Sequence, residues 1–210
     1  MARAAPGPFQ RLAGRPMIPM NRSALLVVVL DFCAIGALPF VFFRRDGRFH
    51  LMWWVTALPF FACPALLVGA ALGVLPMADP WGLRLGDWAD YMAITAAVAS
   101  IAVIFLTLGT HRIPISLWHQ EEDAPEHIVT WGPYRFIRHP FYASFLLAFL
   151  SGAILLPHPF VLACGLYALA VLSFTAAREE RRLCESSFGG EYRAYMASTG
   201  RFFPRVGRRS

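Results

Sequence analysis

Long apolar stretches separated by polar connections constrain this chain more than any other feature. Three of them reach the ~20 residues that a helix needs to cross the hydrocarbon core of a bilayer, and two more are a little shorter. The stretches are 24–43, 51–75, 88–109, 141–156 and 160–177. Inside lipid every backbone polar group must be paired internally, which favours helices. We therefore predict an all-α polytopic membrane bundle of about five transmembrane helices.

The composition of the chain fits a membrane protein. Hydrophobic residues make up 57% and charged residues only 15% of the 210 residues, and the mean hydropathy is +0.51. The net charge of +6 comes from arginine alone, since lysine is absent. These arginines cluster at the ends of the apolar stretches, where anionic lipid headgroups explain them better than nucleic acid does. We expect membrane lipids as partners, and no nucleic acid.

The chain is expected to divide into three parts: a flexible basic tail over 1–23, an N-terminal scaffold of three spans over 24–110, and a catalytic half over 111–210. This last part holds a connecting loop, a helical hairpin that turns at Pro157-His158-Pro159, and a C-terminal amphipathic helix over 191–199. Gly189-Gly190 should break the second hairpin helix, which runs on past Arg182.

The distribution of arginine predicts the orientation in the membrane. Five spans would place the termini on opposite sides, and the side with the C-terminus would collect most of the arginines. The positive-inside rule then puts the C-terminus in the cytosol, in a multi-pass protein of a bacterial-type plasma membrane. The four arginines of the N-terminal tail argue for the opposite orientation.

A polar stretch over 129–142 stands out beside the apolar ones. Arg138 and His139 come directly before Pro140, a residue that suits the first turn of a helix. Both would then lie at a helix N-terminus, which favours anions such as a carboxylate. The alternative is a juxtamembrane anchor, in which arginine meets lipid phosphates and aromatic rings lie at the interface.

A second polar cluster, Arg178-Glu179-Glu180, follows the last apolar stretch. Its carboxylates could form a solvated face with pairs such as Glu179 and Arg182. The functional interpretation is a carboxylate that accepts hydrogen bonds from a cationic or hydroxyl-bearing cofactor. Asp31 lies inside the first apolar stretch, so we expect it to face other helices, in a hydrogen-bond network or a proton relay.

Other common sites are not indicated. The cysteines form no CxxC pair and are expected to be free thiols, and the histidines are too irregularly spaced to predict a metal site. Motifs of soluble nucleotide-binding domains are absent. Any cofactor must therefore be held by helices and the loops between them.

The two polar clusters carry a family resemblance. The first reads Val129-Thr130-x-Gly132-x-Tyr134-x3-Arg138-His139-Pro140-x-Tyr142; the second reads Glu179-Glu180, Leu183, Phe188-Gly189-x-Glu191-Tyr192-x2-Tyr195 and a terminal Phe203-Pro204. In this order the chain resembles the isoprenylcysteine carboxyl methyltransferase family, and more loosely the membrane phospholipid methyltransferases, from about His119 to Pro204. The resemblance implies S-adenosyl-L-methionine as methyl donor, bound in a cytosol-facing pocket of the bundle.

The resemblance also implies site residues. The catalytic residues would be Arg138, which orients a carboxylate, and Glu180, which holds the donor's ammonium or ribose hydroxyls. Arg178 is the candidate for substrate binding, because the family's substrate-side arginine falls on Ala176 here. Glu126 stands where eukaryotic relatives have histidine, with His127 as the neighbouring alternative. The implied cofactor contacts are Glu126, His127, Ile128, Val129, Tyr134, His139, Pro140, Phe141, Tyr142 and Glu180.

We therefore expect an S-adenosylmethionine-dependent integral membrane methyltransferase that acts on a lipid-like or isoprenoid acceptor, with O-methylation of a carboxylate. One alternative is an NADPH-dependent membrane reductase of the sterol-reductase type, whose C-terminal half is broadly similar. Another is a non-enzymatic membrane scaffold. The acceptor stays open among a prenylated thiol acid, an isoprenoid carboxylate, a phospholipid amine and a small hydrophobic thiol.

Overall fold

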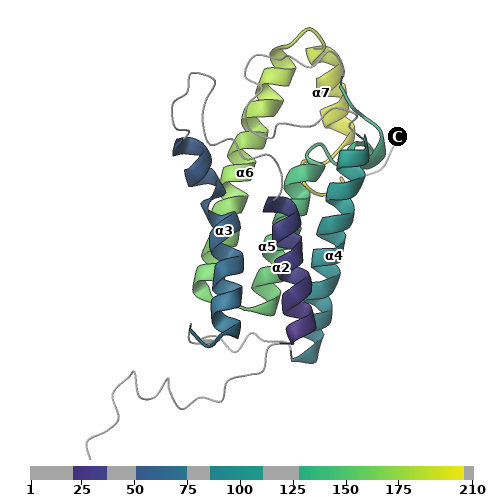
Figure 1. Cartoon of the computed structure of the whole chain (residues 1–210). Coiled ribbons are helices and arrows are strands. Elements are labelled where there is room, and N and C mark those ends of the chain that lie inside the picture. The colour runs from purple at the N-terminus through teal and green to yellow at the C-terminus, as the bar shows by residue number, and fades with distance from the viewer. Residues whose placement is uncertain (1–20, 37–50, 75–85, 111–127, 206–210) are drawn as a thin grey trace, which may run out of the picture.

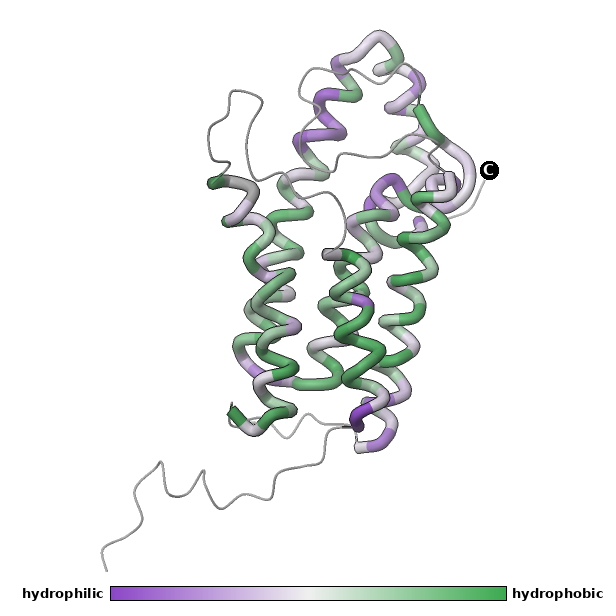
Figure 2. The backbone as a smooth tube through the Cα atoms, in the orientation of Figure 1, coloured by the Kyte–Doolittle hydropathy of each residue, from purple (hydrophilic) through white to green (hydrophobic). Residues whose placement is uncertain are grey.

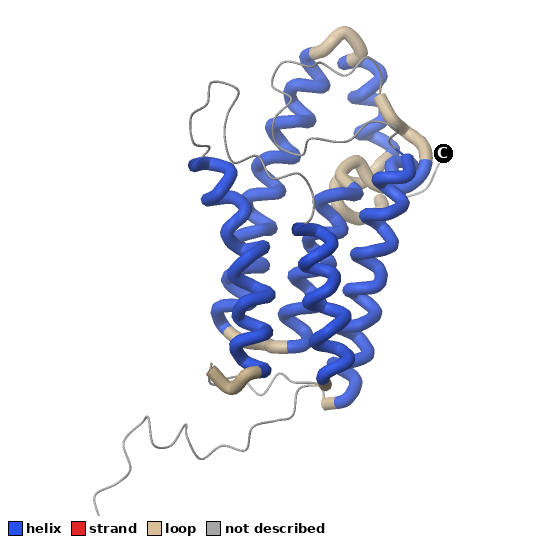
Figure 3. Tube along the Cα trace, viewed as in Figure 1, coloured by secondary structure: helices blue, strands red, loops and turns tan. Residues whose placement is uncertain are grey.

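The computed structural model describes residues 21–36, 51–74, 86–110 and 128–205 (Figure 1). Within these ranges the chain forms helices and no β-strand, which confirms the all-α prediction (Figure 3). The elements are α2 (Arg22–Gly36), α3 (Leu51–Ala71), α4 (Asp87–Thr110), the 3-10 helix η1 (Gly132–Arg135), α5 (Pro140–Leu155), α6 (Pro159–Glu185) and α7 (Gly189–Ser198).

Three of these helices, α3, α4 and α6, are long and apolar enough to cross a membrane, and α5 is a shorter apolar helix. All four begin within a residue of the apolar stretches that predicted them. The first predicted span, 24–43, is represented by α2 as far as Gly36, and the rest of it lies outside the described residues. The chain is therefore an integral membrane protein built as a helical bundle.

The turn between α5 and α6 shows how the sequence sets helix ends. Pro140 and Pro159 each occupy the first turn of their helix, where a missing N–H costs nothing. His158 caps α6, because its Nδ1 accepts a hydrogen bond from the Phe160 N–H at 3.3 Å. The two proline-led helices form the predicted hairpin.

The break after α6 differs from the prediction. The helix ends at Glu185, and Gly189-Gly190 opens α7 rather than ending α6. A side chain at Gly189 would meet the backbone carbonyl oxygen of Cys184, so only glycine permits this tight return of the chain. Gly189 thus serves the approach of α7 to α6, and not the termination of a helix.

Helix α5 lies at the centre of the bundle and contacts α2, α3, α4 and α6. An aromatic cluster fixes it there: the Phe60 ring lies 5.0 Å from the rings of both Phe145 and Phe149, and Phe32 lies 5.3 Å from Phe149. Such edge-to-face pairs add directional packing to the burial of apolar area. These contacts hold the middle of α5 against α2 and α3.

Asp31 faces other helices, as expected. It is fully buried, and the Ser100 hydroxyl of α4 lies 2.8 Å from its Oδ1 and 2.9 Å from the Ser144 carbonyl oxygen of α5. A polar group in an apolar interior is tolerated when it is hydrogen-bonded. This network joins α2, α4 and α5.

The last turns of α6 project beyond the bundle, and α7 lies beside them (Figure 1). The tube changes here from mostly hydrophobic to largely hydrophilic (Figure 2). We call this region the polar end; it comprises 132–139, 178–185, α7 and 199–205.

Candidate functional site

The C-terminal segment is fastened to the start of α5. Ile137 and Gly200 form a parallel β-bridge, the Arg138 N–H donates to the Gly200 carbonyl at 2.8 Å, and the His139 N–H donates to the Arg201 carbonyl at 3.1 Å. A Cβ at Gly200 would meet the Phe203 carbonyl oxygen, so glycine is needed for this close turn. The fastening brings side chains from 138–139 and 201–202 to one place.

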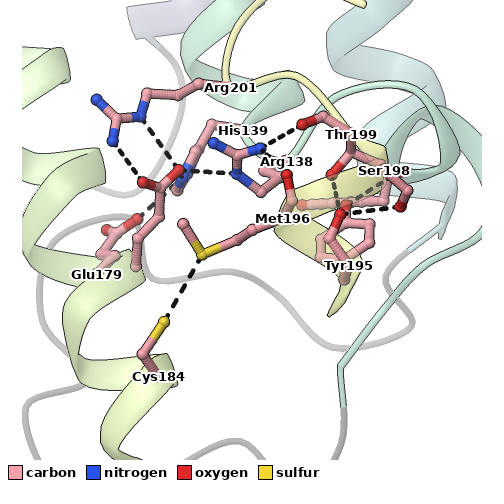
Figure 4. Close-up of polar contacts among 11 residues, drawn as sticks. Arg138, His139, Glu179, Cys184, Tyr195, Met196, Ser198, Thr199 and Arg201 are labelled. Atoms are coloured by element: carbon pink, nitrogen blue, oxygen red, sulfur yellow. Dashed lines mark hydrogen bonds and ion pairs between the residues drawn. The ribbon is translucent and has the colours of Figure 1, made fainter. Parts of the chain in front are cut away.

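Glu180, near the end of α6, is the centre of the site, because Arg138, His139 and Arg201 all contact its carboxylate. Figure 4 shows these three partners close together. Its Oε1 accepts from Arg138 Nε at 2.9 Å and from Arg201 Nε at 3.1 Å, and lies 3.2 Å from His139 Nε2. Its Oε2 accepts from Arg201 Nη2 at 2.5 Å. Charge-assisted hydrogen bonds of this kind are stronger than neutral ones.

The three partners of Glu180 differ in accessibility. The Glu180 side chain is 4% exposed and that of Arg138 10% exposed, while His139 is 9% exposed. Arg201, in contrast, is 38% exposed. Arg138 is also held by the carbonyl oxygens of Met196 and Thr199 at the end of α7. Arg138 and His139 are therefore nearly buried beside Glu180, and Arg201 covers the carboxylate on the solvent side.

Glu179 belongs to a second layer of the site. The Tyr142 hydroxyl donates to its Oε1 at 2.6 Å, and His139 Nδ1 lies 3.5 Å from its Oε2. The rings of His139 and Tyr142 stack with centroids 5.3 Å apart, and Phe202 meets both edge-on. Two carboxylates thus flank an aromatic wall, an arrangement suited to a cation and a flat ring.

Tyrosines brace the outer part of the polar end. The Tyr195 hydroxyl donates to the Tyr134 carbonyl oxygen at 2.6 Å and so ties α7 to η1. Burial raises the pKa of Tyr195 to about 12, and burial also raises the pKa values of Tyr134 and Tyr192. The hydrogen bond to Glu180 raises the pKa of Arg201 above its ordinary value. At neutral pH the tyrosines are therefore neutral donors and Arg201 is a cation.

The structure brings together the central predicted residues, namely Arg138, His139, Tyr142 and Glu180. Pro140 and Phe141 are buried in the interior below them, and Tyr134 lies half-buried in η1. Ile128 and Val129 are half-buried in the segment before η1. Glu126 and His127 lie outside the described residues.

The predicted substrate residue, Arg178, lies two positions before Glu180 on α6. Arg178 is exposed on α6, whereas Ala176 is fully buried in the bundle. Arg135 and Arg138 do not share one face, because the chain turns from η1 into the β-bridge between them. Arg135 is exposed, and Arg138 points to Glu180.

Sequence reasoning missed Arg201 and Phe202. Both lie in an irregular segment without periodicity, and the local signal was only a cation beside the aromatic pair before Pro204. The pairing of Glu179 with Tyr142 was also not foreseen, since it joins residues 37 positions apart. No group of three or more His, Cys, Asp or Glu that could hold a metal ion occurs in the described part of the chain.

The fold and the polar end together define a polytopic membrane protein with a charged site at one end of its bundle. Residues 92–185 match the model of the isoprenylcysteine carboxyl methyltransferase (ICMT) family, a family of membrane methyltransferases. The match runs from within α4 to the end of α6 and confirms the resemblance there, which includes the first motif and Glu179-Glu180; the motif residues from Phe188 to Pro204 lie beyond it. No curated protein and no solved structure matches the chain.

Proposed function

We propose that the protein is a methyltransferase that uses S-adenosyl-L-methionine to methylate a carboxylate on a lipid-like or isoprenoid acceptor. Two contacts carry the proposal. His139 Nε2 lies 3.2 Å from Glu180 Oε1, and the Tyr142 hydroxyl donates to Glu179 Oε1 at 2.6 Å. These contacts join the two hairpin helices at the polar end, where an aqueous cofactor and a membrane-dissolved acceptor can meet.

The chemistry of the residues fits such a donor. S-adenosylmethionine carries an ammonium, a sulfonium and ribose hydroxyls, all of which suit carboxylates, and an adenine ring, which suits aromatic faces. We assign Glu180 to the ammonium or the ribose hydroxyls, and His139, Tyr142 and Tyr134 to the frame of the site. Ile128 and Val129 of the preceding segment are proposed to line it, as are Glu126 and His127.

When bound, the donor supplies an electrophilic methyl group on sulfur, and transfer to a carboxylate oxygen forms a C–O bond while the C–S bond breaks and its electron pair leaves with sulfur. Because a carboxylate carries no proton to remove, no side chain here has to act as a general base. The work of the protein is alignment and exclusion of water, and well-oriented reactants gain roughly 7–11 kcal/mol over free encounter. The buried Arg138–Glu180 pair and the His139–Tyr142 stack keep the first layer of side chains fixed for this task.

The acceptor is proposed to reach the site sideways from the bilayer. The outer face of α6 carries exposed apolar side chains, among them Leu166, Leu169 and Phe174. Such a face is compatible with lipid along α6, up to the level where the carboxylates begin. An isoprenoid tail could thus remain in the membrane while its charged head meets the site.

We further propose that the polar end faces the cytosol of a bacterial-type plasma membrane. Six of the described arginines lie on or after the last turns of α6: Arg178, Arg181, Arg182, Arg193, Arg201 and Arg205. The positive-inside rule favours the cytosolic side for this end. Labelling of single cysteines introduced at exposed positions of α7 in intact cells tests this orientation.

Binding measurements with the purified protein in detergent test the cofactor assignment. Saturable binding of S-adenosylhomocysteine without binding of NADPH is expected for a methyltransferase, and the reverse for a reductase. A scaffold would bind neither. Incubation with labelled methyl donor and a panel of lipid carboxylates, amines and thiols then identifies the acceptor class by the label that enters the lipid phase.

A further inference from the structure

Arg201 is the one partner of Glu180 that can leave without dismantling the polar end. Its side chain is 38% exposed, against 10% for Arg138 and 9% for His139. Arg138 is held additionally by two carbonyl oxygens of α7, and His139 by its stack on Tyr142. Within the described part of the chain, the side-chain hydrogen bonds of Arg201 go only to Glu180.

The backbone of Arg201 is held by hydrogen bonds, although its side chain is partly exposed. The carbonyl oxygen of Arg201 accepts from the His139 N–H at 3.1 Å, and the neighbouring Gly200 is paired with Ile137. A guanidinium that loses Glu180 would therefore stay within reach of the site. The guanidinium would then be an unpaired, partly exposed cation beside the proposed methyl-donor site.

A cationic donor and Arg201 compete for the same carboxylate. Glu180 is 4% exposed, and Arg201 is the most exposed of the groups that cover it. A donor ammonium that approaches Glu180 from the aqueous side must first displace this guanidinium. The displaced guanidinium has five N–H donors in a planar fork that matches a carboxylate.

We propose that Arg201 is the residue that recognises the acceptor's carboxylate, and that its pairing with Glu180 makes this recognition conditional on a bound donor. The inference rests on the proposed function. Without donor, Arg201 is neutralised by Glu180 and offers little to an anion. With donor, Glu180 is engaged elsewhere and Arg201 turns to the acceptor, so donor binds before acceptor and a carboxylate is preferred to a neutral head group.

The proposal also accounts for the place of Arg178. That side chain is exposed on α6 two positions before Glu180, and the buried Ala176 offers no charge. The half-exposed cation that is hydrogen-bonded to Glu180 comes from a segment 21 positions later in the chain. Acceptor specificity would thus reside in the C-terminal segment and not in the α6 helix.

The test compares the wild type with Arg201→Gln, Arg201→Lys and Arg205→Gln in detergent, by equilibrium binding of S-adenosylhomocysteine, farnesoate and farnesol. Arg205 is the matched control, because it is an exposed arginine of the same segment whose guanidinium bonds to the Ala197 carbonyl oxygen. Melting temperatures verify that every variant is folded. Farnesol is the neutral counterpart of farnesoate and reports binding of the tail alone.

In the wild type, saturating S-adenosylhomocysteine is expected to tighten farnesoate binding at least tenfold and to leave farnesol unchanged. Arg201→Gln should abolish this gain while its affinity for S-adenosylhomocysteine stays equal or becomes a few-fold tighter, since the competitor is gone. Arg201→Lys should restore part of the gain, and Arg205→Gln should behave as the wild type.

Two results would overturn the proposal: a wild type that binds S-adenosylhomocysteine but does not then prefer farnesoate, or a folded Arg201→Gln protein that keeps the preference. More than tenfold weaker S-adenosylhomocysteine binding in Arg201→Gln would also overturn it, because Arg201 would then support the donor site. A wild type that does not bind S-adenosylhomocysteine at all is a separate outcome, which removes the proposed function itself.

Discussion

The Nε2 atom of His139 lies 3.2 Å from the Oε1 atom of Glu180, although 41 positions separate the two residues in the chain. The hairpin of α5 and α6 brings them together, because His139 precedes the first helix and Glu180 lies near the end of the second. A site that joins the two polar clusters of the sequence requires this proximity.

Loss of the Tyr142 hydroxyl tests the second layer of the site. Tyr142→Phe removes the 2.6 Å hydrogen bond to Glu179 and is expected to cost about 1 kcal/mol of stability. Because Glu179 would lose its orientation, affinity for S-adenosylhomocysteine should fall roughly five- to tenfold, a change of about 1–1.4 kcal/mol. Calorimetric titration measures the affinity. Tyr167→Phe is the control, since Tyr167 bonds to the Val55 carbonyl oxygen far along α6 and should leave the affinity unchanged.

Glu180 should matter for stability as well as for binding. Glu180→Gln removes the only carboxylate that is hydrogen-bonded to both Arg138 and Arg201 in the described part of the chain, and leaves a nearly buried guanidinium without its counter-charge. Breaking such a pair costs roughly 3 kcal/mol or more. Thermal unfolding in detergent should show a lower midpoint for Glu180→Gln than for Glu185→Gln, an exposed glutamate on the same helix. Equal midpoints would mean that the pair contributes no stability.

Much of the bundle could be predicted from the sequence, since length and hydropathy decide which segments can cross a bilayer. The helices α3, α4, α5 and α6 begin at residues 51, 87, 140 and 159, within one residue of the apolar stretches. Pro140 and Pro159 mark the last two of these starts. The break at Gly189 was misplaced, since a glycine required by a close backbone approach looks the same in sequence as one that ends a helix.

The site was predictable only where its residues lie at or near the ends of the two hairpin helices. Arg138, His139 and Glu180 flank the hairpin, and a hairpin returns its two open ends to the same side of the membrane. Arg201 comes from an irregular segment whose position depends on the bridge between Ile137 and Gly200. A single long-range pairing of this kind has no periodicity, so no pattern in one sequence indicates it.

The fastening of the C-terminal segment depends on Gly200. In Gly200→Ala the new Cβ would meet the Phe203 carbonyl oxygen, so the segment must shift and the hydrogen bonds from the Arg138 and His139 N–H groups should weaken. We expect limited proteolysis after α7 to become several-fold faster. Gly190→Ala is the matched control, because nothing lies within 4 Å of its Cβ position. Identical cleavage of the two variants would show that the fastening tolerates a side chain.

Alkaline pH should loosen the polar end. The pKa of Tyr195 is raised from 10.0 to about 12 in the folded protein, so the folded state keeps its proton where the unfolded state has lost it. The stabilising contribution is fully present below pH 10 and declines as the pH rises toward 12. Tyr195→Phe should lose about 1 kcal/mol at pH 8, because the bond to the Tyr134 carbonyl is gone. Its stability should then fall less steeply than that of the wild type in melting curves between pH 10 and 12. Parallel falls would contradict the assignment.

Equilibrium binding of labelled S-adenosylmethionine to the purified wild type and to His139→Ala and Glu180→Ala is the most direct test of the central claim. The account predicts saturable binding by the wild type, and at least a tenfold loss of affinity in both variants when near-native helical content shows that they are folded. A wild type without saturable binding, or folded variants that bind as tightly as the wild type, would contradict a donor site between these two side chains.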